Sequence, residues 1–312
     1  MKRSLFVSIF TSAVIALILA SCASKAPPPA PAPAQAPPAV EAPAPTPEPA
    51  AVEQAAPVKV AKQRTVVTKV PVLVKEATYY SDGQPDEYFV YKLDEGKKNV
   101  VEKDSLDTTR PDPVQRLLSE YSDGLLTVES VYESNGALRS RRELSYDAQG
   151  RLAQERTLDA KGKVQSSSAY AYDAAGRKIE WRVLDSSGAV KATSSYTYGT
   201  EGMLGVEMKD AADKSTGKIK LEYAAGLLAK RSYLGSDGTL QKYEAYSYEG
   251  GLLASVEYRR ADGSLSSKTA YSRGPLGELV KAVEYDASGA SGPYSTYEYV
   301  VREDSAIETY YE

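Results

Sequence analysis

Histidine is absent from all 312 residues, and cysteine and tryptophan each occur once. Without histidine the chain has no imidazole base, no Ser–His or Cys–His nucleophile pair and few of the usual zinc ligand sets. The single cysteine, Cys22, has no partner for a disulfide, so the protein must fold without covalent cross-links. The sequence also contains no nucleophile-elbow serine and no phosphate-binding loop. We therefore expect no catalytic, cofactor-binding or metal-binding residues.

Carboxylates are the remaining candidates for catalysis, because a pair of Asp or Glu side chains can hydrolyse a glycosidic bond. Asp147, Asp159, Asp173 and Asp185, however, each begin a glycine-containing turn, where bonding to the local backbone explains them. None of these turns has the dense oxygen ligands of a dedicated calcium loop. A carboxylate-dependent carbohydrate-active envelope enzyme stays as the alternative to a non-catalytic protein.

The first 21 residues have the three parts of an export signal peptide. The charged start MKR precedes the apolar run LFVSIFTSAVIALILA, which is shorter than the about 20 residues that span a bilayer. The following LASC resembles the lipobox of bacterial lipoproteins. This resemblance implies cleavage after Ser21, with a diacylglycerol thioether and an N-acyl chain such as palmitate on Cys22. An ordinary signal peptide followed by an incidental cysteine is the alternative.

Acylated Cys22 would make membrane lipid the first partner of the protein, because each buried CH₂ contributes about 0.8 kcal/mol to anchoring. Ala23 replaces the aspartate that retains enteric lipoproteins at the inner membrane, which favours the outer membrane. Cleavage removes two of the 38 basic residues and leaves 36 against 42 acidic ones, a net charge of −6. This acidity argues against nucleic acid as a partner.

Residues 22–58 comprise the lipidated N-terminus and a Pro/Ala-rich linker. Twelve of the 18 prolines lie between residues 25 and 57, and no glycine does. Proline fixes φ and lacks an N–H donor, so such a segment can neither join a sheet nor pack a core. We predict a disordered, polyproline-like tether.

Beyond residue 58 the composition changes, and all 22 glycines and all 24 tyrosines lie there. Turn glycines stand at positions 124, 136, 150, 162, 176, 188, 202, 217, 226, 238, 251, 263, 277 and 289. Two turns make one unit of about 25–26 residues, which is typical of repeat proteins. Asp or Ser at the first turn position bonds its own backbone, and glycine at the fourth supplies φ > 0. We predict an all-β fold, an elongated antiparallel β-meander, with the repeat domain over residues 121–312.

Side chains between the turns follow a regular pattern. The residue two places after the turn glycine is aliphatic in 12 of 14 cases, and Lys178 and Ser291 are the exceptions. It has the same parity as a closing Tyr-x-Tyr, so Val164 should share a sheet face with Tyr170 and Tyr172. We favour the tyrosines as the core of a thin sheet. Exposed tyrosines that stack on sugars or on a protein are the alternative.

The strings YDAQGRL, YDAAGRK and YDASG resemble the YD repeats of Rhs-type bacterial surface proteins, over about residues 120–299. The resemblance implies curling sheets that form shells or elongated surface structures, and it transfers no catalytic residue. The last strand-like run ends at Val301, so we expect no enclosed passenger domain. Residues 59–120 form a less regular β part, in which Pro71 implies an edge strand. The string DPVQ, from Asp112, begins either a short helix or a strand.

Together these features predict a non-enzymatic envelope lipoprotein whose repeat domain is a binding or structural surface. Its partner would be an envelope polysaccharide or a protein.

We expect Cys22→Ala to accumulate as an unprocessed precursor without lipid, because thioether formation precedes cleavage in the lipoprotein pathway. Palmitate labelling and gel mobility measure the two effects. Ser24→Ala, beside the lipobox, is the matched control and should be processed normally. Normal lipid incorporation into the Cys22→Ala protein would refute the lipobox assignment.

Overall fold

The structure is a computed structural model that describes residues 61–311, so the signal peptide, Ser21, Cys22 and the tether lie outside the described residues. The described residues belong to one compact unit. The strands are β1 (Ala61–Tyr79), β2 (Pro85–Leu93), β3 (Val100–Asp107), β4 (Gln115–Ser122), β5 (Leu125–Glu133), β6 (Leu138–Tyr146), β7 (Leu152–Asp159), β8 (Val164–Tyr172), β9 (Lys178–Asp185), β10 (Val190–Tyr198), β11 (Met203–Asp210), β12 (Ser215–Ala224), β13 (Leu227–Leu234), β14 (Leu240–Glu249), β15 (Leu252–Arg260), β16 (Leu265–Arg273), β17 (Leu279–Asp286) and β18 (Ser291–Tyr311). Within residues 61–311, no helix of membrane-spanning length and hydropathy occurs.

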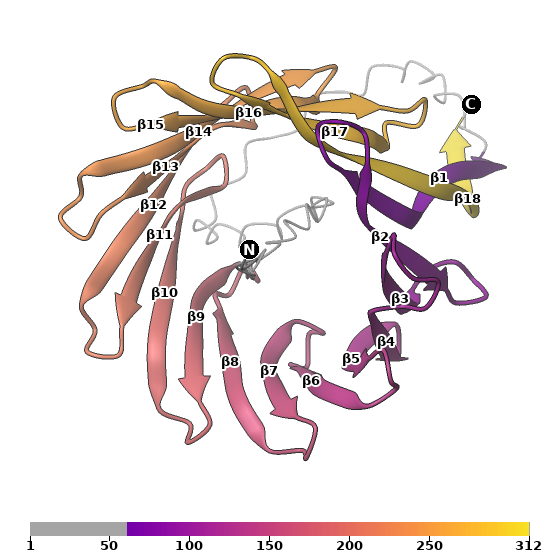
Figure 1. Ribbon diagram of the computed structural model, residues 1–312, viewed down its shortest axis with the longest axis horizontal. Coiled ribbons are helices and arrows are strands. Elements are labelled where there is room, and N and C mark those ends of the chain that lie inside the picture. The colour runs from indigo at the N-terminus through magenta and orange to yellow at the C-terminus, as the bar shows by residue number, and fades with distance from the viewer. Residues whose placement is uncertain (1–60, 312) are drawn as a thin grey trace, which may run out of the picture. The chain divides into compact units, whose positions relative to one another are not determined.

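The strands follow one another around a closed sheet (Figure 1). Each strand pairs antiparallel with its neighbours in sequence, and β1 also pairs with β18. The predicted all-β antiparallel meander is confirmed, and the pairing of the first strand with the last is what the structure adds. Among the described residues, each strand contacts only the two strands beside it. The sheet is therefore a single layer with an inner and an outer face.

The strands β1 and β18 are much longer than the others. Their ladder runs from Ala61 to Tyr79, whereas β2 pairs with β1 only from Lys75 to Tyr79. Pro71 thus lies where β1 has one partner strand, as predicted for an edge. Here β1 and β18 form a two-stranded ribbon, which exposes Val67 and Ile307 on one face.

The segment after Asp112 forms a strand and not a helix, because Gln115 begins β4. This strand pairs with β3 and β5 like the strands that follow it. The repeat register therefore decides between the two structures that the sequence allowed.

The predicted turn chemistry is confirmed. One oxygen of Asp147 accepts the N–H groups of Gln149 and Arg151, both at 2.9 Å, and Gly150 has φ 73°. These backbone N–H groups, that of Arg151 first, hold the pKa of Asp147 below its usual range. Gly217 is a correction, because it lies inside β12 and not in a turn. Asp213, at φ 60°, takes the turn position instead, since Asp tolerates the left-handed conformation.

A second correction concerns the faces of the long strands. Thr157 pairs with Ser166, but Leu158 pairs with Val164, so one residue of β8 is bulged out. A bulge shifts the alternation of side chains. Val164 therefore lies on the face opposite Tyr170, beside the buried Leu158, and the predicted shared face is wrong.

A tyrosine hydroxyl fastens each unit of the repeat at one rim of the sheet. The ladder between β7 and β8 ends at Gln154 and Ala169, and beyond it the Tyr172 hydroxyl donates to the Leu152 carbonyl at 2.8 Å. We call these bonds the staples. Their donor–acceptor pairs are Tyr121–Val100, Tyr146–Leu126, Tyr172–Leu152, Tyr198–Lys178, Tyr223–Met203, Tyr248–Leu228, Arg273–Leu253 and Tyr299–Leu279. In one unit the Arg273 guanidinium replaces the tyrosine and reaches the same carbonyl at 3.2 Å.

The arginine of the YD-x-x-G-R string connects a turn to the next staple. Arg151 Nε donates to the Asp147 carboxylate at 2.7 Å, and its guanidinium lies 4.6 Å from the Tyr172 ring centre. Arg177 repeats both contacts one unit later. Four residues of the string thus have a defined role. The Tyr donates the staple, the Asp caps the turn, the Gly adopts the left-handed conformation, and the Arg covers the ring of the next staple tyrosine.

We expect Gly176→Val to destabilise the protein by about 1–3 kcal/mol, because it forces a β-branched residue to a positive φ. Gly176 has φ +79° and an almost open surrounding, so the strain is in the backbone. Gly176→Asn, which tolerates this conformation, is the control. Since strands contact only their neighbours, lost hydrogen-exchange protection should stay within roughly residues 146–198. Uniform loss as far as Tyr299 would show that the sheet opens as one unit.

We expect Tyr172→Phe to lower the free energy of unfolding by about 1 kcal/mol, because the Leu152 carbonyl loses its donor. Arg273→Tyr should preserve stability and Arg273→Leu should not. Tyr258→Phe is the control, since no described residue is hydrogen-bonded to the Tyr258 hydroxyl. Urea midpoints measure all four variants. Equal midpoints for Tyr172→Phe and Tyr258→Phe would show that the staples contribute nothing.

Candidate binding surface

One cross-strand pair per unit lies at mid-height on the same face of the sheet, and we call these pairs the inner belt. They are Ser119–Glu129, Leu144–Glu155, Tyr170–Trp181, Tyr196–Val206, Leu221–Arg231, Tyr246–Val256, Tyr271–Ala282 and Tyr297–Glu76. Each even-strand member stands two residues before a staple donor. The staples thus set a common height, and residues far apart in sequence become neighbours around the sheet.

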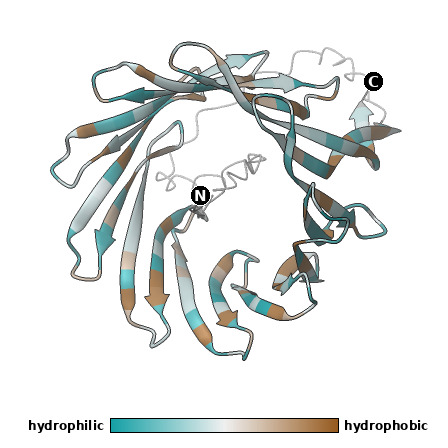
Figure 2. Cartoon of the chain, viewed as in Figure 1, coloured by the Kyte–Doolittle hydropathy of each residue, from teal (hydrophilic) through white to brown (hydrophobic). Residues whose placement is uncertain are grey.

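The belt lies on the concave face. Burial is the largest cause of the raised pKa of Tyr196 and raises the pKa of Tyr170 to about 12. On the opposite face, hydrogen bonds to carboxylates are the largest causes of the raised pKa of Arg116 and Arg259. Hydrophobic and hydrophilic residues alternate along the strands (Figure 2). Burial is also the largest cause that acts on the pKa of Arg142 and of Arg231, both on the belt face. Atoms crowd around side chains on the side toward which a closed sheet curves, so the belt faces inward.

Charges on the inner face occur in compact clusters. Arg142 Nε donates to Glu129 at 2.8 Å, and its Nη1 reaches Glu155 at 3.3 Å. Burial alone would lower the pKa of Arg142, but the two carboxylates outweigh it and raise the pKa. This arginine is therefore fully engaged by its neighbours.

A second cluster lies on the inner face of β13 and β14. Glu244 pairs with Arg231 at 3.3 Å and accepts the Tyr233 hydroxyl at 2.8 Å. The Tyr246 hydroxyl also donates to Glu244, and burial first, then this bond, raises the pKa of Tyr246. Arg231, Tyr233 and Tyr246 thus all engage this one carboxylate.

The inner face of β8, β9 and β10 differs from both clusters. Tyr170 stands directly opposite Trp181. The Lys178 ammonium lies 5.7 Å from the Tyr170 ring centre and 4.6 Å from that of Tyr196. Burial lowers the pKa of Lys178. We call these four residues the Trp181 site.

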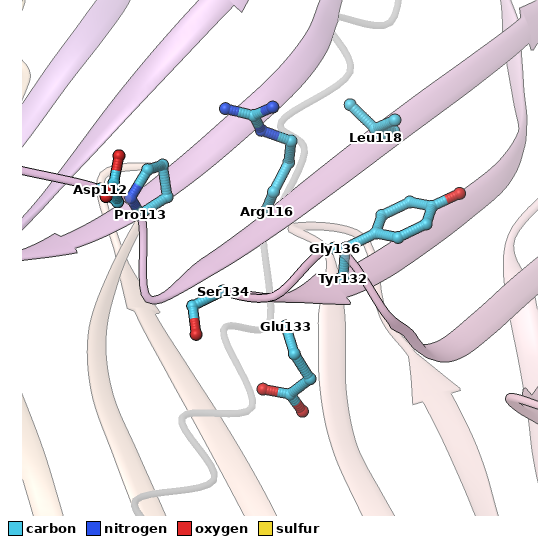
Figure 3. Close-up of a pocket in the computed structure, with 8 residues that line it drawn as sticks. All are labelled: Asp112, Pro113, Arg116, Leu118, Tyr132, Glu133, Ser134 and Gly136. Atoms are coloured by element: carbon cyan, nitrogen blue, oxygen red, sulfur yellow. The ribbon is translucent and has the colours of Figure 1, made fainter.

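The outer face has a hollow of about 400 Å³ beside the loop between β3 and β4. Figure 3 shows Arg116, Leu118 and Tyr132 on one side of the strands, with Glu133 directed away. Arg116 is already bound to the buried Asp104, at 2.7 and 3.0 Å. The one cation among the described residues that line the hollow is therefore already engaged.

The sequence-based candidates fall into separate places. Cys22 and Ser21 lie outside the described residues. The turn aspartates lie at the rims, where their oxygens are bound to backbone N–H groups. Within residues 61–311, no three acidic side chains converge as metal ligands. Most of the described tyrosines are half-buried, and Tyr80 and Tyr258 are exposed, so they are partly core and partly surface.

Sequence reasoning did not identify the Trp181 site. The signal that was available is the repeat itself, since Lys178 is the one charged residue at a position that is aliphatic in 12 of 14 cases, three residues before the single tryptophan. Finding the site also requires the strand register, because Tyr170 and Tyr196 belong to neighbouring strands.

No protein-family model and no curated protein matches this chain. The TcdB2–TccC3 complex is similar in structure, at 16% identity and a TM-score of 0.34, over 69% of this chain and 12% of that one. A porin-like protein of Bacteroides uniformis is 12% identical with a TM-score of 0.41, over 73% of this chain and 98% of that one. A porin-like protein of Bacteroides vulgatus is 10% identical with a TM-score of 0.35, over 73% of this chain and 98% of that one. This chain thus spans about an eighth of the TcdB2–TccC3 chain, and similarity at this level assigns no function.

Proposed function

We propose that this protein is a non-catalytic envelope lipoprotein, anchored by lipid on Cys22, whose closed β-repeat domain binds an envelope component through its inner face. The inner belt supports the proposal. Its aromatic rings lie along a face that no opposite strand covers in the described part of the chain. Aromatic residues with a few fixed polar groups are typical of binding surfaces.

The anchoring part of the proposal rests on the N-terminal sequence. The apolar run, the lipobox-like LASC and the Pro/Ala-rich tether favour an exported protein held by lipid. Ala23 favours the outer membrane. The partner would be an envelope polysaccharide or a protein, and the acidic chain argues against nucleic acid.

The ion pairs on the inner face favour binding over catalysis. A glycosidase needs one carboxyl group that holds a proton near neutral pH. Glu129 and Glu155 share Arg142, and Glu244 is bound to Arg231. These carboxylates are thus engaged by arginines, whereas the acid of a glycosidase stands in an apolar pocket. The carboxylate-dependent enzyme therefore remains as an outcome of the test.

We expect the full-length protein in detergent to sediment with envelope polysaccharide from producing cells and to release no new reducing ends. Tyr271→Ala, on the inner face, should reduce the sedimented fraction severalfold. Arg182→Ala, on the exposed outer face, is the control, and urea midpoints confirm folding. Hydrolysis that Glu155→Gln abolishes would replace the binding protein with an enzyme. Equal sedimentation of both variants would exclude the inner face as the binding surface.

A further inference from the structure

Lys178 breaks the repeat where the fold does not require it. Its carbonyl accepts the Tyr198 staple at 2.7 Å, as the equivalent carbonyls do in the other units. Those acceptor residues are Val100, Leu126, Leu152, Met203, Leu228, Leu253 and Leu279. The staple uses only the main chain, so an aliphatic side chain would serve the fold as well. A half-buried lysine at this position loses hydration of its charge, and the staple gains no stability from its side chain.

The Lys178 ammonium has aromatic neighbours and no counter-ion. It lies over the faces of Tyr170 and Tyr196. No carboxylate among residues 61–311 is paired with it, and desolvation is the single cause of its lowered pKa. Glu155, which acts on the pKa of Tyr170 and not on that of Lys178, is engaged by Arg142. Cation–π contacts compensate part of the lost hydration, and an anion would compensate the rest.

Trp181 supplies a flat surface beside this charge. It forms the belt pair with Tyr170, and this is the one pair of the inner belt in which both residues are aromatic. Its indole N–H is covered and has no acceptor among the described residues. A covered donor without a partner costs about 1–3 kcal/mol, so the indole, like Lys178, stands here at a cost to stability.

The ligand class follows from what the inner face offers. The closed part of the sheet has no free strand edge, so a peptide cannot bind there by adding a strand. One unpaired cation does not provide the several basic groups that the phosphates of a nucleic acid need. What remains is a ligand recognised through its rings and one negative charge. Sugars bearing a carboxylate have both features.

We propose that the Trp181 site binds an acidic glycan, with a sugar ring on Trp181 and its carboxylate on the Lys178 ammonium. This inference rests on the proposed function and names its ligand class. Tyr170 and Tyr196 flank the charge and restrict the carboxylate to one position.

Trp181 is the single tryptophan of the chain, so fluorescence excited at wavelengths that the 24 tyrosines do not absorb reports on this site alone. The full-length protein is titrated with oligogalacturonate, oligoglucuronate and oligomannuronate, and with the carboxyl-reduced form of each. We expect at least one acidic oligosaccharide to change the Trp181 emission, with at least tenfold weaker binding after carboxyl reduction.

Lys178→Leu is the decisive variant, because it restores the aliphatic residue of the other units and keeps the tryptophan. It should retain or raise the urea midpoint and weaken acidic-glycan binding at least tenfold. Lys230→Leu is the matched control. Lys230 lies 4.5 Å from the Tyr243 ring centre on the outer face, so the variant removes the same charge from a similar contact.

Equal binding by Lys178→Leu and by the wild type, or equal binding of acidic and carboxyl-reduced sugars, would overturn the proposal. So would an unchanged emission with every acidic oligosaccharide. If sedimentation with envelope polysaccharide persists in those cases, the proposed function stands and the site lies elsewhere. If sedimentation is also absent, the proposed function fails as well.

Discussion

The repeat depends on a hydrogen bond from a tyrosine hydroxyl to a main-chain carbonyl of the neighbouring strand. The two strands of each odd–even hairpin separate at one rim, where the ladder ends and a carbonyl loses its donor. An unpaired carbonyl costs about 1–3 kcal/mol when it is shielded from water, and the hydroxyl removes that cost. Arg273 makes the same bond with a guanidinium. The fold thus requires a side chain long enough to bring a hydrogen-bond donor to this carbonyl, and tyrosine is one residue that does so.

Because the staples bond to main-chain carbonyls, the side chains of the inner face can vary without loss of these bonds. Because each strand touches only its neighbours, a residue that varies there disturbs one unit and not a shared core. The inner belt accordingly holds aromatic, aliphatic and charged pairs at equivalent positions. Arg142 with Glu129 and Glu155 shows how charge is tolerated, since each group has a partner. Lys178 is the contrasting case, in which the partner is missing from the described residues.

Closure of the sheet explains the two long strands. Bringing together segments separated by more than 200 residues costs on the order of 5 kcal/mol of chain entropy. The strands β1 and β18 have 19 and 21 residues, against 8 to 10 in the others, and pair along almost their whole length. A long ladder offsets the entropy that a single short strand pair would leave uncompensated. In the closed part of the sheet, each strand is paired on both sides, so recognition on the inner face relies on side chains.

The sequence by itself determined the local structure, because turns and strands are specified by nearby residues. The Asp and Gly of YDAQGRL set the turn at Gly150, the spacing set the strands, and Pro71 marked an edge. Two features escaped it. The bulge in β8 moved Val164 away from Tyr170, and closure joined Ala61 to Tyr311, since a ladder is specified by both of its strands together. Only the tertiary structure decided which face is inner, and only the register brought Tyr170, Lys178, Trp181 and Tyr196 together from three strands.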